Sequence, residues 1–107
     1  MINKNTSIYS LIDPLNNKTF YIGRTTLTLG QRLSGHISEA KMGYPNPKCE
    51  TIRLILSAGL KPEIKLLDEV NSQDGRSRET HFIDWALKSG LELTNQREPL
   101  FGGYYGF

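Results

Sequence analysis

Two short segments near the start of the chain are dominated by β-branched, aliphatic and aromatic residues. They span residues 7–13 (SIYSLID) and 19–23 (TFYIG), and the intervening PLNNK has the composition of a turn. Isoleucine, threonine and the aromatic residues favour strands, whereas proline and asparagine favour turns. We therefore predict a β-hairpin at this end of the chain.

The length of the hairpin loop decides whether Tyr9 and Tyr21 lie on the same face of the sheet. A two-residue turn at the two asparagines would put the tyrosines on opposite faces, because side chains alternate along a strand. A five-residue loop over residues 13–17 would pair them on one face. Pro14 favours the longer loop, because proline cannot donate a hydrogen bond to a strand pair.

The next segment has the apolar period of an amphipathic helix. Its apolar stripe consists of Leu29, Leu33, Ile37 and Ala40. Thr26 or Thr28 could cap the start of this helix. Arg32 and His36 lie one turn apart at the margin of the stripe, so we expect them where the helix meets the sheet.

Two further helices and a third strand complete the predicted pattern. Asn46 is a plausible cap for a helix that begins at Pro47 and ends before Gly59. Residues 62–70 (PEIKLLDEV) have the composition and length of a strand, and the last helix is expected over about residues 77–90. The predicted order is strand, strand, helix, helix, strand, helix, which places the chain in the α+β class.

Glu79 lies on the apolar face of the last helix. The apolar residues that follow it at i+3, i+4, i+7 and i+8 are Phe82, Ile83, Ala86 and Leu87. This spacing aims the Glu79 carboxylate toward the interior. An unpaired carboxylate there would be costly, so Glu79 needs an arginine, a lysine or a divalent metal as partner. A purely structural Glu–Arg pair is the alternative to a metal site.

Size and composition limit the functional classes. The chain has 107 residues, enough for one compact domain but not for a catalytic domain with a full recognition domain. A net charge of +2 is weak evidence for a nucleic-acid partner. The single cysteine, Cys49, excludes an intrachain disulfide and favours a reducing compartment, so we expect a cytoplasmic protein. No apolar run approaches the roughly 20 residues that span a bilayer, so we expect no membrane association.

Several polar residues could take part in phosphate or proton chemistry. Arg32 and His36 could bind a phosphate and assist proton transfer, although ordinary helix positions with a buried, satisfied histidine would look the same. Taken singly, Tyr9 and Tyr21 are more typical of half-buried strand aromatics than of catalytic residues. As a general base, a tyrosine is handicapped by its reference pKa of about 10 and needs nearby positive charge, which Arg24 and Arg32 could supply.

Taken together, SIY at 7–9 and YIG at 21–23, separated by eleven residues, resemble the paired motif that names the GIY-YIG nuclease family. Ser7 replaces the first glycine of the motif and leaves Tyr9 in place. The resemblance continues at Arg32, His36, Glu79 and Asn95. It covers about residues 7–95 and implies a small three-stranded antiparallel sheet flanked by helices.

The resemblance also implies a metal-dependent endonuclease that hydrolyses DNA with one divalent ion, Mg²⁺ or Mn²⁺. Glu79 would hold the ion, and Arg32 would bind the scissile phosphate. We further expect Arg24 to contact DNA together with Arg32. A single inward carboxylate suits Mg²⁺, which commonly keeps several waters and uses one or two carboxylates together with phosphate oxygens.

The remaining implied roles concern protons and hydrogen bonds. Tyr9 would be the leading candidate for the base toward the attacking water. Tyr21 and His36 would orient or polarise that water and the base, and Asn95 would support the site by hydrogen bonding.

We expect a single nuclease domain over residues 1–107, with a core at about 7–95 and an irregular C-terminal tail over 96–107. So little chain is left for substrate choice that nicking or structure-dependent cleavage is favoured over recognition of a long sequence. A protein partner or a dimer would then help to select the substrate. The rival functions are a catalytically silent nucleic-acid-binding or protein-interaction module, and a metal-free phosphodiesterase that would stay active in chelator.

Overall fold

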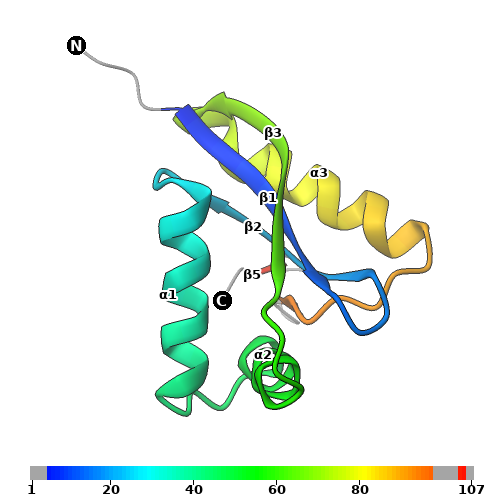
Figure 1. The fold of residues 1–107 in the computed structure, drawn as a ribbon. Helices are drawn as coiled ribbons and strands as arrows, with labels where there is room; N and C mark the ends of the chain where they lie inside the picture. Colours follow the sequence, from blue (N-terminus) through cyan, green and yellow to red (C-terminus); the bar gives the residue numbers. More distant parts are fainter. Residues whose placement is uncertain (1–4, 98–103, 106–107) are drawn as a thin grey trace.

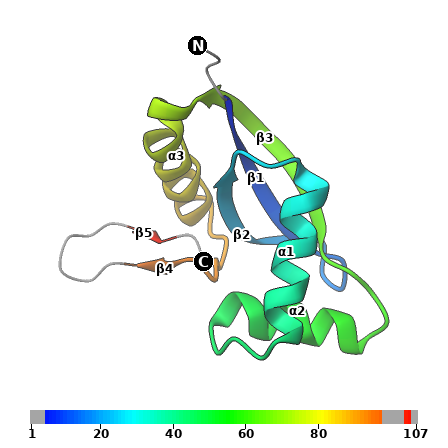
Figure 2. The ribbon, with the colours of Figure 1, turned by 90° about the vertical axis from the view of Figure 1, so that its left-hand side faces the viewer.

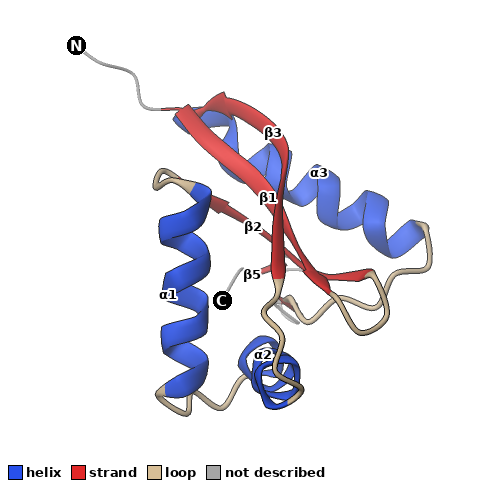
Figure 3. Ribbon diagram, viewed as in Figure 1, coloured by secondary structure: helices blue, strands red, loops and turns tan. Residues whose placement is uncertain are grey.

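The computed structural model describes residues 5–97 and 104–105. Its elements are β1 (Asn5–Asp13), β2 (Lys18–Thr25), α1 (Leu29–Lys41), α2 (Pro47–Ser57), β3 (Glu63–Asn71), the 3₁₀ turn η1 (Ser72–Asp74), α3 (Gly75–Lys88), β4 (Gln96–Arg97) and β5 (Tyr104–Tyr105). Figure 1 shows their arrangement in space, and Figure 3 distinguishes helices from strands. The predicted β-β-α-α-β-α order and the α+β class are confirmed.

The three long strands form an antiparallel sheet with the order β2-β1-β3. In Figures 1 and 2, α1 and α2 lie on one side of this sheet and α3 lies on the other. The central strand β1 is therefore covered on both faces, which agrees with its nearly continuous burial. Strand β2 forms one edge of the sheet, so side chains from both faces can reach its outer margin.

Each face of the sheet has its own hydrophobic core, because successive side chains on a strand point to opposite faces. The core toward α1 and α2 contains Tyr9, Leu11, Phe20, Tyr21, Ala40, Cys49, Ile52 and Ile55. The core toward α3 contains Ile8, Ile22, Ile83 and Ala86. Strands β1 and β2 thus direct Tyr9 and Tyr21 toward α1, and Ile8 and Ile22 toward α3.

A β-bulge in the hairpin decides the face of Tyr21. Asp13 pairs with Lys18 across a connection of four residues, and without a bulge this register would put the two tyrosines on opposite faces. The register shifts between Leu11 and Ile12, where β2 contributes one extra residue. Leu11 then pairs with Tyr21, and both tyrosines face α1. The prediction that both tyrosines share a face is confirmed. The predicted five-residue loop was wrong, because the connection has four residues and the extra residue lies in the bulge of β2 instead.

The helix starts follow the predicted capping residues, with one exception. Thr28 caps α1 in a capping box with Gln31, and Asn46 caps α2 by accepting a hydrogen bond from the Cys49 amide. Helix α3 begins at Gly75, two residues earlier than expected, because η1 leads directly into it. A Cβ at Gly75 would lie 3.0 Å from Thr6 Cγ2, so this helix start packs closely against β1.

The tail is less irregular than expected. The two-residue strands β4 and β5 pair with each other in antiparallel register, Gln96 with Tyr105 and Arg97 with Tyr104. The rest of the predicted tail, residues 98–103 and 106–107, lies outside the described residues. In the part of the chain that is described, no helix has both the length and the apolar character needed to cross a membrane.

Candidate active site

The centre of the site is a hydrogen-bonded group formed by β1 and α1. The Tyr9 hydroxyl lies 2.7 Å from Nε2 of His36, and both side chains are buried. Arg32, one helical turn before His36, donates a hydrogen bond from Nε to the Tyr9 oxygen at 3.3 Å. The i, i+4 spacing on α1 thus presents two nitrogen groups to one phenol oxygen.

Tyr21 joins this group from β2. Its ring centroid is 6.2 Å from that of Tyr9 and 5.3 Å from that of His36, which it meets edge to face. Gly23 makes room for both tyrosines, because a Cβ at that position would lie 2.5 Å from the Tyr9 hydroxyl and 2.8 Å from Cε2 of Tyr21. The glycine of the YIG segment is therefore required by the close packing of the two rings.

Burial keeps the Tyr9 phenol and the His36 imidazole uncharged in the free protein, beside the charged Arg32. Burial raises the pKa of Tyr9, and the nearby Arg32 guanidinium only partly offsets this. Burial, together with the positive charges of Lys48 and Arg32, lowers the pKa of His36 to about 2. The phenol therefore keeps its proton at neutral pH, and the imidazole is neutral.

Glu79 approaches from α3 on the opposite face. As the helical spacing predicted, its carboxylate is largely inward, with 8% of the side chain exposed. Burial raises its pKa, and the charges of Arg24 and Arg76 oppose this effect. Its negative charge also raises the pKa of Tyr9 and of Tyr21, so Glu79 belongs to the same electrostatic environment as the tyrosines.

The ion pair between Glu79 and Arg24 is weak. Arg24 Nε lies 3.9 Å from Glu79 Oε1, near the limit of an ion pair, and 43% of the Arg24 side chain is exposed. A contact at this distance with a half-exposed partner that solvent screens contributes little. Arg24 therefore does not satisfy the buried carboxylate well, and an additional cation could bind there.

The available ligand is a single carboxylate, which suits a hard divalent ion that is also held by water and substrate rather than one held entirely by protein ligands. Within the described residues, no group of three or more His, Cys, Asp or Glu side chains lies close enough together to hold a metal ion. Glu79 would then be the protein ligand, with the other positions taken by water and phosphate oxygens. Mg²⁺ accepts this kind of coordination, because it usually keeps several waters and uses one or two carboxylates.

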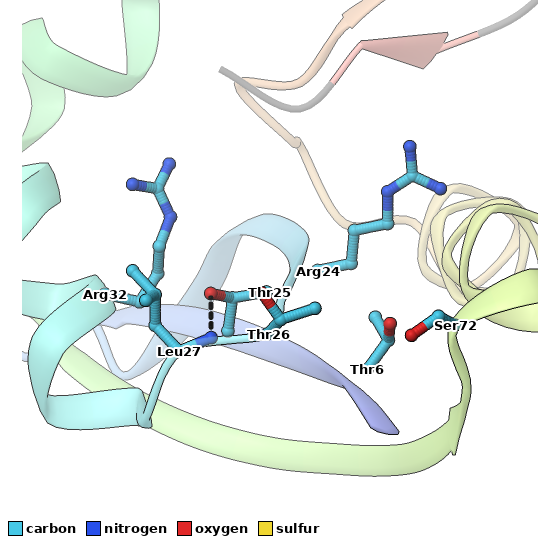
Figure 4. Close-up of a pocket in the computed structure, with 7 residues that line it drawn as sticks. All are labelled: Thr6, Arg24, Thr25, Thr26, Leu27, Arg32 and Ser72. Carbon is cyan, nitrogen blue, oxygen red and sulfur yellow. Dashed lines mark hydrogen bonds between the residues drawn. The ribbon is translucent and has the colours of Figure 1, made fainter. Parts of the chain in front are cut away.

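An open pocket of about 530 Å³ lies beside the side chains of Tyr9, His36 and Arg32, and its lining carries positive charge. It is lined by Thr6, Arg24, Thr25, Thr26, Leu27, Arg32 and Ser72. In Figure 4, Arg24 and Arg32 lie on opposite sides of Thr25 and Thr26. The Thr25 hydroxyl accepts a hydrogen bond from the Leu27 amide. A pocket with two guanidinium groups and no carboxylate in its lining suits an anion such as a phosphodiester.

Asn95 contacts the backbone of the edge strand β2. Its Oδ1 accepts a hydrogen bond from the Ile22 amide at 3.0 Å, and its Nδ2 donates to the Ile22 carbonyl at 2.7 Å. Thr94 adds bonds from its amide and hydroxyl to the Phe20 carbonyl. Residues 94 and 95 thus cover the outer edge of β2 and hold the strand that carries Tyr21.

Sequence reasoning missed three residues around the site: Gly23, Glu39 and Lys48. Gly23 was recognised only as part of a motif, because its close contacts depend on the register of two strands. Glu39 follows His36 at i+3, a spacing that could have indicated a contact on one helix face. Lys48 carried no such signal, because only the packing of α2 against α1 brings it to the site.

Comparison with models of known protein families gives one finding for this chain. The model described as the GIY-YIG catalytic domain matches residues 5–92, which is most of the sequence. No match was found among curated proteins or among solved structures.

Proposed function

The chain belongs to the GIY-YIG nuclease family, and on this premise we propose that it is an endonuclease that hydrolyses DNA phosphodiester bonds with one divalent metal ion. Nucleases of the family act on nucleic acids and generally depend on a divalent metal. The observation that carries the proposal is the Tyr9–His36–Arg32 group, with the buried Glu79 carboxylate in the same electrostatic environment.

The hydrogen bond between Tyr9 and His36 provides a path for the proton of the attacking water. The water oxygen forms a bond to phosphorus while its proton passes to the Tyr9 oxygen. Tyr9 passes its own proton to Nε2 of His36, 2.7 Å away. The bond from phosphorus to the leaving oxygen breaks with its electron pair on that oxygen, which takes up a proton from solvent. Tyr9 thus acts as a base without first existing as a phenolate, which the raised pKa of its hydroxyl would disfavour.

Arg32 links substrate binding to the basicity of His36. In the free protein, the Arg32 charge helps to lower the pKa of His36. A phosphate bound by Arg32 would neutralise that charge and so make His36 a better proton acceptor. Arg24, on the other side of the pocket, would bind the same strand of DNA. Both arginines offer several donors in a fixed plane, which suits phosphate oxygens.

Glu79 is the residue that would hold the ion, Mg²⁺ or Mn²⁺. When bound, the ion would offset the negative charge that develops on the phosphate. The weak pair with Arg24 argues against a purely structural Glu–Arg contact, because the buried carboxylate remains poorly compensated.

We also propose that residues 1–107 form a single nuclease domain with its core at about 7–95, which nicks DNA or cuts branched DNA.

The first test is cleavage of supercoiled plasmid and of a branched DNA, in Mg²⁺ and in chelator. The parent should cut in Mg²⁺ and not in chelator. Glu79→Gln should lose at least about a hundredfold in rate, since a metal stabilises charge by several kcal/mol and each 1.36 kcal/mol is tenfold. Glu63→Gln, the same change at an exposed position on β3, is the matched control and should cut like the parent.

Two outcomes would contradict the proposal. Undiminished cleavage in chelator would favour a metal-free phosphodiesterase. Binding of DNA without cleavage of either substrate, by a folded parent protein, would favour a catalytically silent binding module.

A further inference from the structure

One ring nitrogen of His36 has no hydrogen-bond partner among the described residues. Nε2 is bonded to Tyr9, whereas Nδ1 is buried and has no hydrogen-bond partner within the described residues. A buried polar nitrogen without a partner is costly, because the hydrogen bond to water that it loses on burial is not replaced. The nearest acidic group is the Glu39 carboxylate, one turn along α1, whose Oε1 lies 3.7 Å from Nδ1. That distance is slightly too long for a hydrogen bond, and a small side-chain rotation would close it.

Lys48 holds this carboxylate from a different helix. Its side chain on α2 is 1% exposed, and its Nζ lies 3.5 Å from Glu39 Oε1. The same ammonium group lies 5.4 Å from the centroid of the Tyr21 ring, within the range of a cation–π contact. Lys48 therefore contacts both the carboxylate behind His36 and the second tyrosine of the site.

A buried lysine is unusual, and its position here is specific. Fully buried lysines are rare unless they are paired, because burial disfavours the charged form. Burial lowers the pKa of Lys48, and Glu39 is the main group that opposes this. A contact that served only to join α1 to α2 could have been made by apolar side chains at lower cost.

The proposed reaction depends on which nitrogen of His36 carries the proton. Nε2 can accept a proton from Tyr9 only if the neutral ring is protonated on Nδ1. A carboxylate beside Nδ1 stabilises that tautomer, because it accepts a hydrogen bond from N–H and repels a bare nitrogen lone pair. The Glu39 carboxylate is the group positioned to stabilise the tautomer protonated on Nδ1.

We propose that Glu39 and Lys48 are positioning residues: Lys48 holds Glu39 against Nδ1 of His36, and Glu39 fixes the tautomer in which Nε2 accepts the Tyr9 proton. Neither residue touches the substrate. The catalytic part of this inference rests on the proposed nuclease function, whereas the tautomer itself is a property of the free protein.

The tautomer is measured directly by ¹⁵N–¹H correlation spectra of the full chain labelled at histidine, without metal or DNA. His36→Gln assigns the signals. In the parent, His36 should be protonated at Nδ1 and unprotonated at Nε2. Glu39→Gln and Lys48→Met should each move the ring toward the Nε2-protonated form or a mixture. Glu50→Gln, the same amide substitution at an exposed position on α2, should leave the spectrum of His36 unchanged.

Cleavage kinetics give the second readout. Glu39→Gln should lower kcat roughly tenfold or more, within the roughly 10²–10⁴-fold that a positioned acid–base group contributes. Its KM should stay near the parent value, because Arg24 and Arg32 are unchanged. The double variant Glu39→Gln/Lys48→Met should lose little more kcat than either single variant, because both changes disrupt the same contact between Glu39 and Nδ1 of His36.

A parent ring protonated at Nε2 would overturn the inference, as would a folded Glu39→Gln protein with unchanged tautomer and kcat. A parent protein that cuts no DNA would refute the nuclease proposal alone, because the spectra would still decide the role of Glu39 and Lys48.

Discussion

The buried histidine shows how folding can keep a single residue neutral at a cost in stability at low pH. His36 has no exposed surface, and its surroundings keep it neutral over the physiological pH range. In the unfolded chain, the same side chain is expected to titrate near its reference pKa of about 6.5. Folding therefore removes a proton-binding group whenever the pH is below that value.

We predict that stability falls as the pH falls below about 6.5. The folded pKa of about 2 is below the unfolded value, so the unfolded state binds more protons between them and stability rises with pH in this window. The contribution of His36 is up to about 1.4 kcal/mol per pH unit. Denaturant unfolding of the parent and of His36→Gln between pH 7 and pH 5 measures it.

The His36→Gln variant should show a flatter dependence of unfolding free energy on pH than the parent. His81→Gln is the control, since this second histidine is exposed on α3 and its loss leaves the buried His36 in place. A parent and a His36→Gln variant with equal slopes would contradict the account of a neutral, buried imidazole.

At the scale of elements, strand β2 organises the site. Its bulge turns Tyr21 toward α1, and Gly23, two residues on, provides the space in which both rings lie. Asn95 fixes the strand from outside through the Ile22 backbone. The phenol positions thus depend on the path of one edge strand as much as on the helix that carries Arg32 and His36.

Gly23→Ala should damage activity more than stability. The added Cβ would lie 2.5 Å from the Tyr9 hydroxyl and 2.7 Å from Cζ of the same ring, so at least one tyrosine must move. Such overpacking costs about 1–3 kcal/mol. A displacement of about 1 Å in the reacting groups can cost about a hundredfold in rate. Denaturant unfolding and plasmid cleavage measure the two effects.

Gly30→Ala is the control for the same substitution. A Cβ at Gly30, in the first turn of α1, would meet nothing within 4 Å. This variant should keep full activity and should gain about 0.5–1 kcal/mol of stability, because alanine favours a helix more than glycine does. A fully active Gly23→Ala protein would show that the rings do not need their observed positions.

At the scale of the whole molecule, the site is assembled from both faces of one small sheet. The tyrosines and α1 contribute from one face, α3 contributes Glu79 from the other, and the edge strand β2 lies between them. The described residues contain one such set, and under the proposed function one set would cut one strand at a time.

We therefore predict that supercoiled plasmid is converted to nicked circles before linear DNA forms. Linear product should appear only after a lag, through a second independent event. A time course on agarose gels, at several protein concentrations, measures this order. Linear DNA that appears together with nicked circles, with a rate that rises as the square of protein concentration, would instead indicate two subunits that act together.

The sequence by itself determined the order of the three long strands and three α-helices, and it identified most of the polar residues of the candidate site. Strand and helix composition, the caps at Thr28 and Asn46, and the inward direction of Glu79 follow from local periodicity and local hydrogen bonds. Such features involve residues close together in the chain, so a single sequence can predict them. The resemblance to the nuclease family, later supported by the match over residues 5–92, depended on short motifs of the same kind.

Only the tertiary structure decided the contacts between distant segments. The bulge at β2 depends on how two strands pair, and Gly23 has meaning only once both tyrosines occupy one face. The contact of Lys48 with Glu39 depends on the packing of α2 against α1, because the two residues lie on different helices. Long-range packing determines burial, and burial determines the protonation of His36, so the chemistry of the site could not be predicted from residue types alone.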